Sequence, residues 1–333
     1  MYQVNLFVIS KLVTIILTAV AGRLARNINI SSKPRDRKRI YRQLKFFGFY
    51  PVVIAVFIFM MFILIHLERT PITDRLRFVV FQYENSDIGV GSDIEVLENE
   101  YNGHLLSRNK SAVLSVRNVT NTIIKANKEL SERGNWTVYL VEDKSCNAYV
   151  INGRFIIVYE GLLAAVDSTD QLAFVLGHEM AHVVLKHSSE SHSVFSLIDI
   201  IFLLTLFVIW CLSPSKIRAF VLSLICVTLL SLLVFQPHTR YLESEADQVG
   251  LMFAVKACYD FRAGAALWEN IVRLQNITNT TRHIPDFFLS HPAEIKRAVY
   301  LSLLKEPAKL WRSENRHCTS LVETDEQEVC PKP

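Results

Sequence analysis

The chain has 333 residues, half of them hydrophobic, and its mean hydropathy is +0.24. The apolar residues are concentrated in a few long runs, which is typical of a membrane protein with a soluble part. A net charge of +4 is too small to indicate a nucleic-acid partner. The six cysteines form no C-x-x-C pair and two lie inside apolar runs, so their spacing favours neither a disulfide framework nor a cysteine zinc site.

Residues 1–45 form a basic N-terminal region. It contains the apolar run Leu12–Gly22, and most of its ten Lys and Arg residues follow that run, with Asp36 as the single acid. A secretory signal has its positive charge before the apolar run, so that class is disfavoured. Two interpretations remain: a mitochondrial presequence, or a first membrane-spanning or interfacial helix with a basic flank.

Residues 46–67 contain no Asp, Glu, Lys or Arg. As a helix they would extend about 33 Å, enough to cross a hydrocarbon core of about 30 Å. This segment is therefore predicted to be a transmembrane helix. The basic stretch before it predicts that the N-terminal side lies in the matrix or cytosol and that the following chain lies across the membrane.

Residues 68–304 read as one domain, interrupted by an apolar hairpin at 198–237 and followed by a polar tail at 305–333. The hairpin either crosses the bilayer twice or dips in and returns, and a pair of buried core helices is the alternative. Expected elements in the domain are a helix over Val113–Arg133, a strand over Trp136–Val141, a β-hairpin over Asn147–Tyr159 turning at Asn152-Gly153, a capped helix from Ser168 past His187, a helix over Thr239–Ile271 and a helix over Pro292–Leu304.

The strongest chemical signal is His178-Glu179-Met180-Ala181-His182, an H-E-x-x-H motif. Residues four apart share one helix face, so both imidazoles can bind one metal ion. Zinc in such a site polarises a carbonyl and activates water, and Glu179 is placed to take the proton from that water. The motif predicts a zinc hydrolase.

A second helix supplies carboxylates. In the segment Glu243-Ser244-Glu245-Ala246-Asp247, either glutamate can complete a His₂Glu ligand set, but only one of them can face the metal because they lie about 200° apart around the helix. Asp247 is placed to accept the free N–H of a ligating histidine. Downstream, His291 is a candidate donor to the developing oxyanion, with Arg297 one to two turns later, but from the residues alone a surface or capping histidine is the preferred interpretation of His291. His187 is expected at the surface or beside a ligand, and Cys258 is expected to be a buried packing residue or a redox-sensing thiol.

These segments resemble the membrane gluzincins, the group that includes the CAAX prenyl proteases and HtpX. The closest resemblance is to the OMA-type protease of the mitochondrial inner membrane. It is carried by the H-E-M-A-H and E-S-E-A-D helices with the apolar hairpin between them, by Glu68–Thr73, by Asn147–Val150 and by Ala254–Cys258. The resemblance covers residues 66–304.

The resemblance implies an α+β fold: a mostly helical gluzincin domain with a small antiparallel sheet. It implies one zinc ion per subunit held by His178, His182 and Glu243, which selects Glu243 over Glu245. It makes Glu179 and His291 catalytic and Asp247 an orienting residue. It assigns Asn147, Ala148, Tyr149 and Val150 to the strand that pairs with extended substrate backbone, and it makes Arg297 either a structural residue or a substrate-binding one.

The function implied is endoproteolysis of membrane or juxtamembrane protein segments in stress quality control, including cleavage of the inner-membrane dynamin-like fusion GTPase. The expected location is the mitochondrial inner membrane, with the catalytic domain facing the intermembrane space. Expected partners are protein substrates and the lipid bilayer, and a homo-oligomer is compatible with the resemblance. Six N-x-S/T sequons leave open an ER membrane protease of the CAAX or HtpX type. A catalytically inactive membrane scaffold is the other alternative, and the complete ligand set argues against it.

Overall fold

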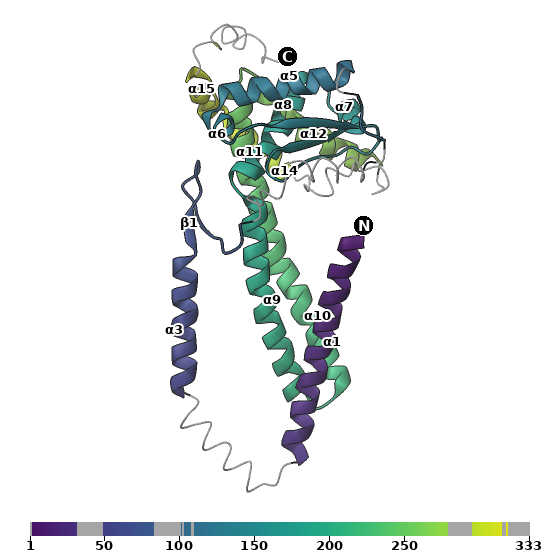
Figure 1. The fold of residues 1–333 in the computed structure, drawn as a ribbon, viewed down its shortest axis with the longest axis vertical. Coiled ribbons are helices and arrows are strands. Elements are labelled where there is room, and N and C mark those ends of the chain that lie inside the picture. The colour runs from purple at the N-terminus through teal and green to yellow at the C-terminus, as the bar shows by residue number, and fades with distance from the viewer. Residues whose placement is uncertain are drawn as a thin grey trace, which may run out of the picture. The chain divides into compact units, whose positions relative to one another are not determined.

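The computed structural model describes residues 2–31, 49–82, 101, 103–107, 110–278, 295–314 and 318 (Figure 1). The chain divides into two compact units. The first unit contains Met1–Thr70, Asp74–Phe81 and Ser189–Thr239, and the second contains Pro71–Thr73, Gln82–Ser188 and Arg240–Pro333. Each unit is described by itself below.

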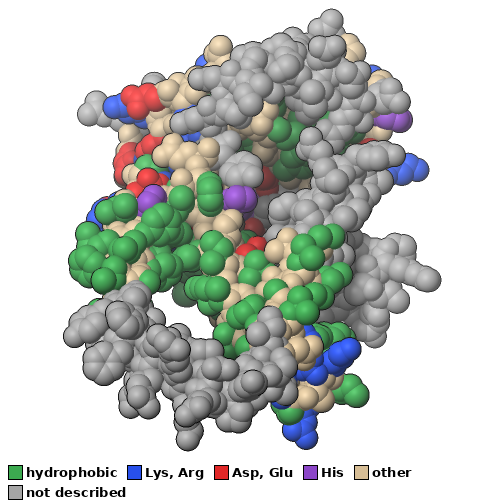
Figure 2. All heavy atoms as spheres, turned by 60° about the horizontal axis from the view of Figure 1, so that its bottom comes forward, with side chains coloured by type: hydrophobic (Ala, Val, Ile, Leu, Met, Phe, Trp, Pro, Cys, Tyr) green, Lys and Arg blue, Asp and Glu red, His purple; other side chains and the backbone are tan. Residues whose placement is uncertain are grey.

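The first unit consists of long apolar helices and a short hairpin. Its elements are α1 (Tyr2–Ser31), α3 (Phe49–Ile65), β1 (Leu67–Arg69), β2 (Leu76–Phe78), most of α9 (His187–Leu212), α10 (Lys216–Leu230) and a π-helix, η1 (Ser231–Phe235). The strands β1 and β2 pair antiparallel. Figure 2 shows hydrophobic side chains over much of the face on which these helices come forward.

The exposed apolar surface of these helices is suited to lipid. Along α3 most large apolar side chains are more than a third exposed, from Val53 to Ile65, and the helix falls inside the predicted span 46–67. By length and composition, α9 and the continuous helical run Lys216–Lys256 are two candidate membrane spans. Water would penalise so much contiguous apolar surface, whereas a hydrocarbon core would not.

Arginine side chains of α1 bind the C-terminal end of α9. Arg23 donates to the carbonyl of Ser213 at 3.0 Å, and Arg26 donates to the carbonyl of Leu212 at 2.7 Å. The last carbonyls of a helix lack backbone donors and carry partial negative charge, so guanidinium groups stabilise them. The two arginines that follow the first apolar run therefore act within the first unit as a cap for α9.

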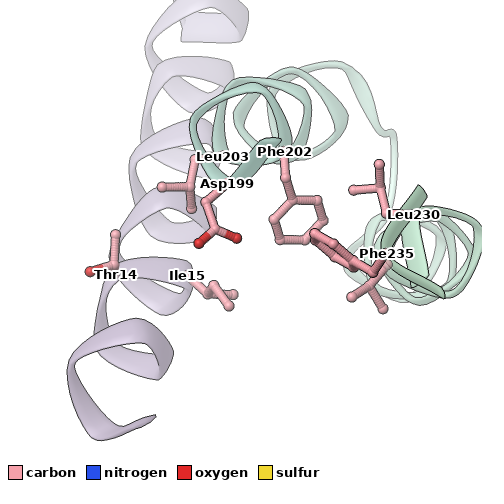
Figure 3. Close-up of a pocket in the computed structure, with 8 residues that line it drawn as sticks. Thr14, Ile15, Asp199, Phe202, Leu203, Leu230 and Phe235 are labelled. Atoms are coloured by element: carbon pink, nitrogen blue, oxygen red, sulfur yellow. The ribbon is translucent and has the colours of Figure 1, made fainter. Parts of the chain in front are cut away.

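A cavity of about 320 Å³ lies among these helices (Figure 3). Thr14 of α1, Phe202 of α9 and Phe235 of η1 contribute to its wall, and the carboxylate of Asp199 points into the space between α1 and α9. The residues that line the cavity belong to the first unit, whereas the metal-ligand motifs belong to the second.

The second unit combines helices with a three-stranded sheet. Its elements are α5 (Ser111–Ala126), α6 (Lys128–Ser131), β3 (Thr137–Val141), β4 (Ala148–Ile151), β5 (Phe155–Tyr159), α7 (Glu160–Ala165), α8 (Thr169–Val184), most of α11 (Gln236–Lys256), α12 (Arg262–Thr278), α14 (Ile295–Leu303) and α15 (Lys305–Ser313). The chain is thus mostly helical with small sheets, as the sequence predicted.

The sheet has the strand order β3-β5-β4, which makes β4 an edge strand. The strands β4 and β5 pair antiparallel around the predicted hairpin turn, where Asn152 and Gly153 both have positive φ. The turn is confirmed, and Arg154 completes a three-residue loop. The expectation of a purely antiparallel sheet is wrong, because β3 and β5 pair parallel after a crossover through β4.

Helix α8 is buried along almost its whole length, between α5, α12 and β4. The predicted cap at its start is confirmed: the Gln171 amide donates to Ser168 Oγ at 3.2 Å, and Gln171 Oε1 accepts from the Asp167 amide at 2.8 Å. The prediction that this helix runs past His187 is wrong. It ends at Val184, and Lys186 takes a left-handed conformation with φ 53°.

Two other expected helices are interrupted. The Val113–Arg133 segment breaks at Asn127, whose buried side-chain amide donates to the carbonyls of Ile123 and Phe253. The Thr239–Ile271 segment breaks after Lys256, at a turn in which Cys258 has φ 71°.

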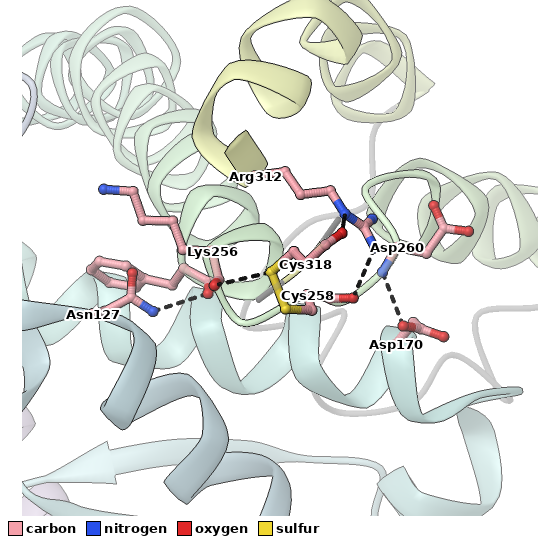
Figure 4. The surroundings of a disulfide bond; sticks show 8 residues. Asn127, Asp170, Lys256, Cys258, Asp260, Arg312 and Cys318 are labelled. Carbon is pink, nitrogen blue, oxygen red and sulfur yellow. Dashed lines mark hydrogen bonds between the residues drawn. A yellow bond between two sulfur atoms is a disulfide. The ribbon is translucent and has the colours of Figure 1, made fainter. Parts of the chain in front are cut away.

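That turn contains a disulfide between Cys258 and Cys318 (Figure 4). Both sequence-based interpretations of Cys258, as a packing residue or a redox-sensing free thiol, are therefore wrong. The turn is further held by the Asp260 amide, which donates to Asp170 Oδ1 at 2.9 Å. A pairing across 60 positions leaves no local signal in a sequence.

Candidate metal centre

The helices α8 and α11 approach each other closely through two glycines. A Cβ atom added to Gly250 would lie 2.6 Å from the backbone nitrogen of His178, and one added to Gly177 would lie 2.7 Å from the carbonyl oxygen of Gly250. Only glycine permits this contact between backbones. The crossing is directly beside the H-E-x-x-H motif, so it sets the distance between the histidines on α8 and the carboxylates on α11.

The structure brings His178, His182 and Glu243 together. The two Nε2 atoms are 3.1 Å apart, and the Glu243 carboxylate oxygens lie 3.4 Å from His178 Nε2 and 3.6 Å from His182 Nε2. Tetrahedral zinc with ligands at about 2.0–2.1 Å would require about 3.3–3.4 Å between ligand atoms. The donor set and its spacing therefore fit a zinc ion, and these three residues are the one group within the described part of the chain that could hold a metal ion.

Asp247 contacts the His178 ligand, and Arg297 contacts both Asp247 and Glu243. Asp247 is fully buried, and its Oδ1 lies 3.1 Å from His178 Nδ1. Arg297 holds the same carboxylate through two hydrogen bonds of 2.7 and 2.8 Å and approaches Glu243 Oε2 at 3.1 Å. Its guanidinium also stacks 3.8 Å over the Trp268 ring. At 5% exposure Arg297 faces the ligands rather than an open substrate site.

The charges in this cluster perturb one another. Burial lowers the pKa of His178, but contacts with the carboxylates of Asp247 and Glu243 outweigh it and raise that pKa to about 9. Burial raises the pKa of Asp247, but the guanidinium of Arg297 and the contact with His178 lower it below its ordinary value overall. Asp247 is therefore an anion at neutral pH, as a partner of a ligating imidazole N–H must be.

Glu179 follows His178 on α8 and is 4% exposed. His182 is the more open ligand, with 18% of its side chain exposed. The other residue expected to act in the reaction, His291, lies outside the described residues.

Glu245 does not join the ligand triangle. One of its oxygens lies 3.2 Å from His187 Nε2, and the other accepts a short hydrogen bond from Thr73 Oγ1. His187 in turn places its Nδ1 2.9 Å from Nδ1 of His182. From the sequence, Glu245 was expected only as an alternative ligand to Glu243, and Thr73 was noted only as part of the Glu68–Thr73 segment that resembles the family.

The edge strand β4 contains the predicted substrate-binding segment Asn147–Val150. It pairs with β5 on one side only, and its pairing is extended by the Asn147 carbonyl, which accepts from the Tyr159 amide at 3.0 Å. Tyr149 on this strand bonds to the hydroxyls of Tyr101 and Tyr159. Burial and these two contacts raise the pKa of Tyr149, so its hydroxyl stays protonated at neutral pH.

Residues 112–304 match the profile of Peptidase family M48. The chain belongs to peptidase family M48. Its M48 relatives include the cattle protein "Metalloendopeptidase OMA1, mitochondrial", 30% identical over 270 residues that make up 80% of this chain and 51% of that protein. The zebrafish protein of the same name is 30% identical over 320 residues, covering 94% and 66% of the two chains. The baker's yeast protein "Mitochondrial metalloendopeptidase OMA1" is 25% identical over 256 residues, 71% and 68% of the two chains.

The OMA-type resemblance is thereby confirmed at the level of the M48 family and its OMA1 members. The chain spans about half the length of the cattle and human relatives it matches.

Proposed function

We propose that this M48 protein is a zinc-dependent endopeptidase. The observation that carries the proposal is the triangle of His178, His182 and Glu243, whose ligand atoms lie at distances suited to one tetrahedral metal ion, with Glu179 next to it on α8. A zinc ion held there would supply a Lewis acid for the scissile carbonyl and would acidify water.

The chain's own residues would perform the remaining steps. The Glu179 carboxylate takes a proton from the attacking water and delivers it to the leaving amine. Asp247, fixed by Arg297, keeps His178 oriented with its Nδ1 proton directed away from the metal. His291 is proposed, on the family pattern alone, to stabilise the developing oxyanion.

The edge strand β4 is proposed to bind the substrate. Its outer backbone groups could pair with an extended polypeptide, which gives affinity along the main chain without demanding one side-chain sequence. Asn147, Ala148, Tyr149 and Val150 would make this contact. Arg297 was expected to be structural or substrate-binding, and its burial against Asp247 supports a role in holding the metal ligands.

The proposed location is the mitochondrial inner membrane, with the catalytic unit in the intermembrane space. The mitochondrial relatives and the candidate spans support the membrane assignment. The Cys258–Cys318 disulfide supports an oxidising compartment for the second unit, because reducing compartments keep such pairs as thiols. The substrates are proposed to be membrane or juxtamembrane proteins, including the dynamin-like fusion GTPase, in stress quality control.

The decisive test uses the full chain purified in detergent beside Glu179→Gln, with Glu142→Gln as a matched control at an exposed position. We expect one zinc per chain in all three proteins. Cleavage of an unfolded protein substrate is expected in the parent and in the control, and a loss of at least about 100-fold in Glu179→Gln. Absence of zinc from the parent, or equal cleavage by Glu179→Gln, would refute the proposal.

A further inference from the structure

A row of polar side chains leads away from the metal centre, starting at His182 rather than at His178, the histidine that Asp247 contacts. It begins at His182 Nδ1, which lies 2.9 Å from His187 Nδ1. His187 Nε2 lies 3.2 Å from Glu245 Oε2, and Glu245 Oε1 is bonded to Thr73 Oγ1. His187 and Glu245 are 3% and 6% exposed, and all four residues belong to the second unit.

The break between α8 and α9 creates the first contact of this row. On an uninterrupted helix His187 would lie about 140° around the axis from His182, too far for their rings to meet. Lys186 instead adopts φ 53°, a conformation that non-glycine residues rarely take. The chain turns there, and the His187 ring packs against the His182 ring with centroids 4.9 Å apart. The strained conformation of Lys186 therefore places the His187 ring against the His182 ring, next to the metal centre.

The direction of each hydrogen bond follows from the ligand geometry. His182 Nε2 faces the other two ligands, so it needs its lone pair for the metal and the ring proton is on Nδ1. Nδ1 then donates to Nδ1 of His187, which must be the acceptor. His187 consequently carries its proton on Nε2 and donates it to Glu245, a carboxylate that also accepts from the Thr73 hydroxyl.

We propose that Thr73, Glu245 and His187 form a positioning relay that fixes the tautomer and orientation of the zinc ligand His182. The inference rests on the proposed zinc function and extends it. The relay is the counterpart, for the second histidine, of what Asp247 does for the first. It assigns a role to Thr73, in the segment that follows β1, and to Glu245, which is not a ligand.

A packing role alone would leave these contacts unexplained. A buried carboxylate is costly unless donors satisfy it, and Glu245 receives one donor from the histidine and one from the threonine hydroxyl. Outer partners of a metal-bound histidine orient the ring and increase its basicity, and losing one typically costs about 10- to 100-fold in metal affinity. Removal of any member of the relay should therefore be detected at the metal.

The test measures the zinc dissociation constant of the full chain in detergent by competition with a chromogenic chelator. Two substitutions are made at His187. His187→Leu fills the space but accepts no hydrogen bond, and we expect zinc binding to weaken about 10- to 100-fold. His187→Asn places an amide oxygen near the former Nδ1 and should recover most of that affinity. If His187 only packed, leucine would be tolerated in this buried site at least as well as asparagine, and that order would overturn the inference.

A second pair tests the far end of the relay. Thr73→Val removes the hydroxyl at almost constant shape and is expected to weaken zinc binding several-fold, whereas Thr73→Ser is expected to bind as the parent does. Asn127→Ala is the matched control: it removes a buried amide elsewhere in the second unit, so it should lower the melting temperature without changing zinc affinity.

Equal affinities for Thr73→Val and Thr73→Ser would remove Thr73 from the relay and refute the proposal as stated. A parent that binds no zinc would instead refute the proposed function, so the two failures are distinguishable.

Discussion

The crossing of α8 and α11 at two glycines makes a quantitative prediction. In Gly250→Ala the new methyl group would lie 2.6 Å from the His178 backbone nitrogen, whereas ordinary contact begins at 3.4 Å. The difference, 3.4 − 2.6 = 0.8 Å, is the separation that the backbones must gain, because no flexible side chain is available to give way. Metal sites tolerate changes of about 0.2 Å in ligand distances. The three ligands would therefore no longer fit one ion.

The expected effects on stability and on metal binding differ in size. Overpacking costs about 1–3 kcal/mol, and replacing glycine by alanine inside a helix returns about 1 kcal/mol. The free energy of unfolding of the metal-free protein should thus fall by only about 0–2 kcal/mol, and the fold should survive. Zinc affinity should fall by at least about 10-fold, because the displacement exceeds what the ligand set tolerates.

The assay combines a chelator competition for zinc with thermal unfolding in EDTA. Gly134→Ala serves as the control. Gly134 has φ 103° with open space around it, so the substitution strains the backbone and lowers stability without moving a metal ligand. We expect the control to lose melting temperature and keep its zinc affinity. If Gly250→Ala bound zinc as tightly as the parent, the helix crossing would not set the geometry of the site, and this reasoning would be wrong.

Three further predictions concern the second unit. A metal-free His178 is protonated below its pKa of about 9, and zinc must displace that proton in order to bind. Zinc affinity, measured by competition titration, should therefore rise about tenfold per pH unit from pH 7 towards 9 and then level off. Arg297→Met leaves the buried carboxylate of Asp247 without its counter-ion and should lower the free energy of unfolding by about 3–5 kcal/mol in urea titrations; a loss below about 1 kcal/mol would contradict this account. Cys318→Ser opens the 60-residue loop closed by Cys258 and should cost about 2–4 kcal/mol, a difference that must disappear when parent and variant are compared in reductant.

The features that the sequence predicted well are those with local signals. The capping pair Ser168 and Gln171 begins α8 where expected, and Asn152 and Gly153 both have the positive φ that the predicted turn requires. The convergence of His178, His182 and Glu243 could be predicted because spacing along two helices, together with family motifs, determines which side chains share a face.

The features that the sequence did not predict depend on distant partners. Lys186 carries no glycine or asparagine signal for a left-handed helix end, and its conformation permits the contact between His187 and His182. The partner of Cys258 is 60 positions away, and the parallel pairing of β3 with β5 depends on a crossover rather than on strand composition. In each case tertiary contacts override local preference.

The position of the apolar hairpin between α8 and α11 has a consequence for biogenesis. During synthesis the two histidines emerge first, and Glu243 follows only after α9 and α10 have been made. A nascent chain that has not yet completed its membrane segments holds two of three ligands and lacks the carboxylate that closes the set. Until α10 and the start of α11 have been made, the chain therefore cannot bring together the three candidate metal ligands, and the two apolar helices α9 and α10 always exist before the set is complete.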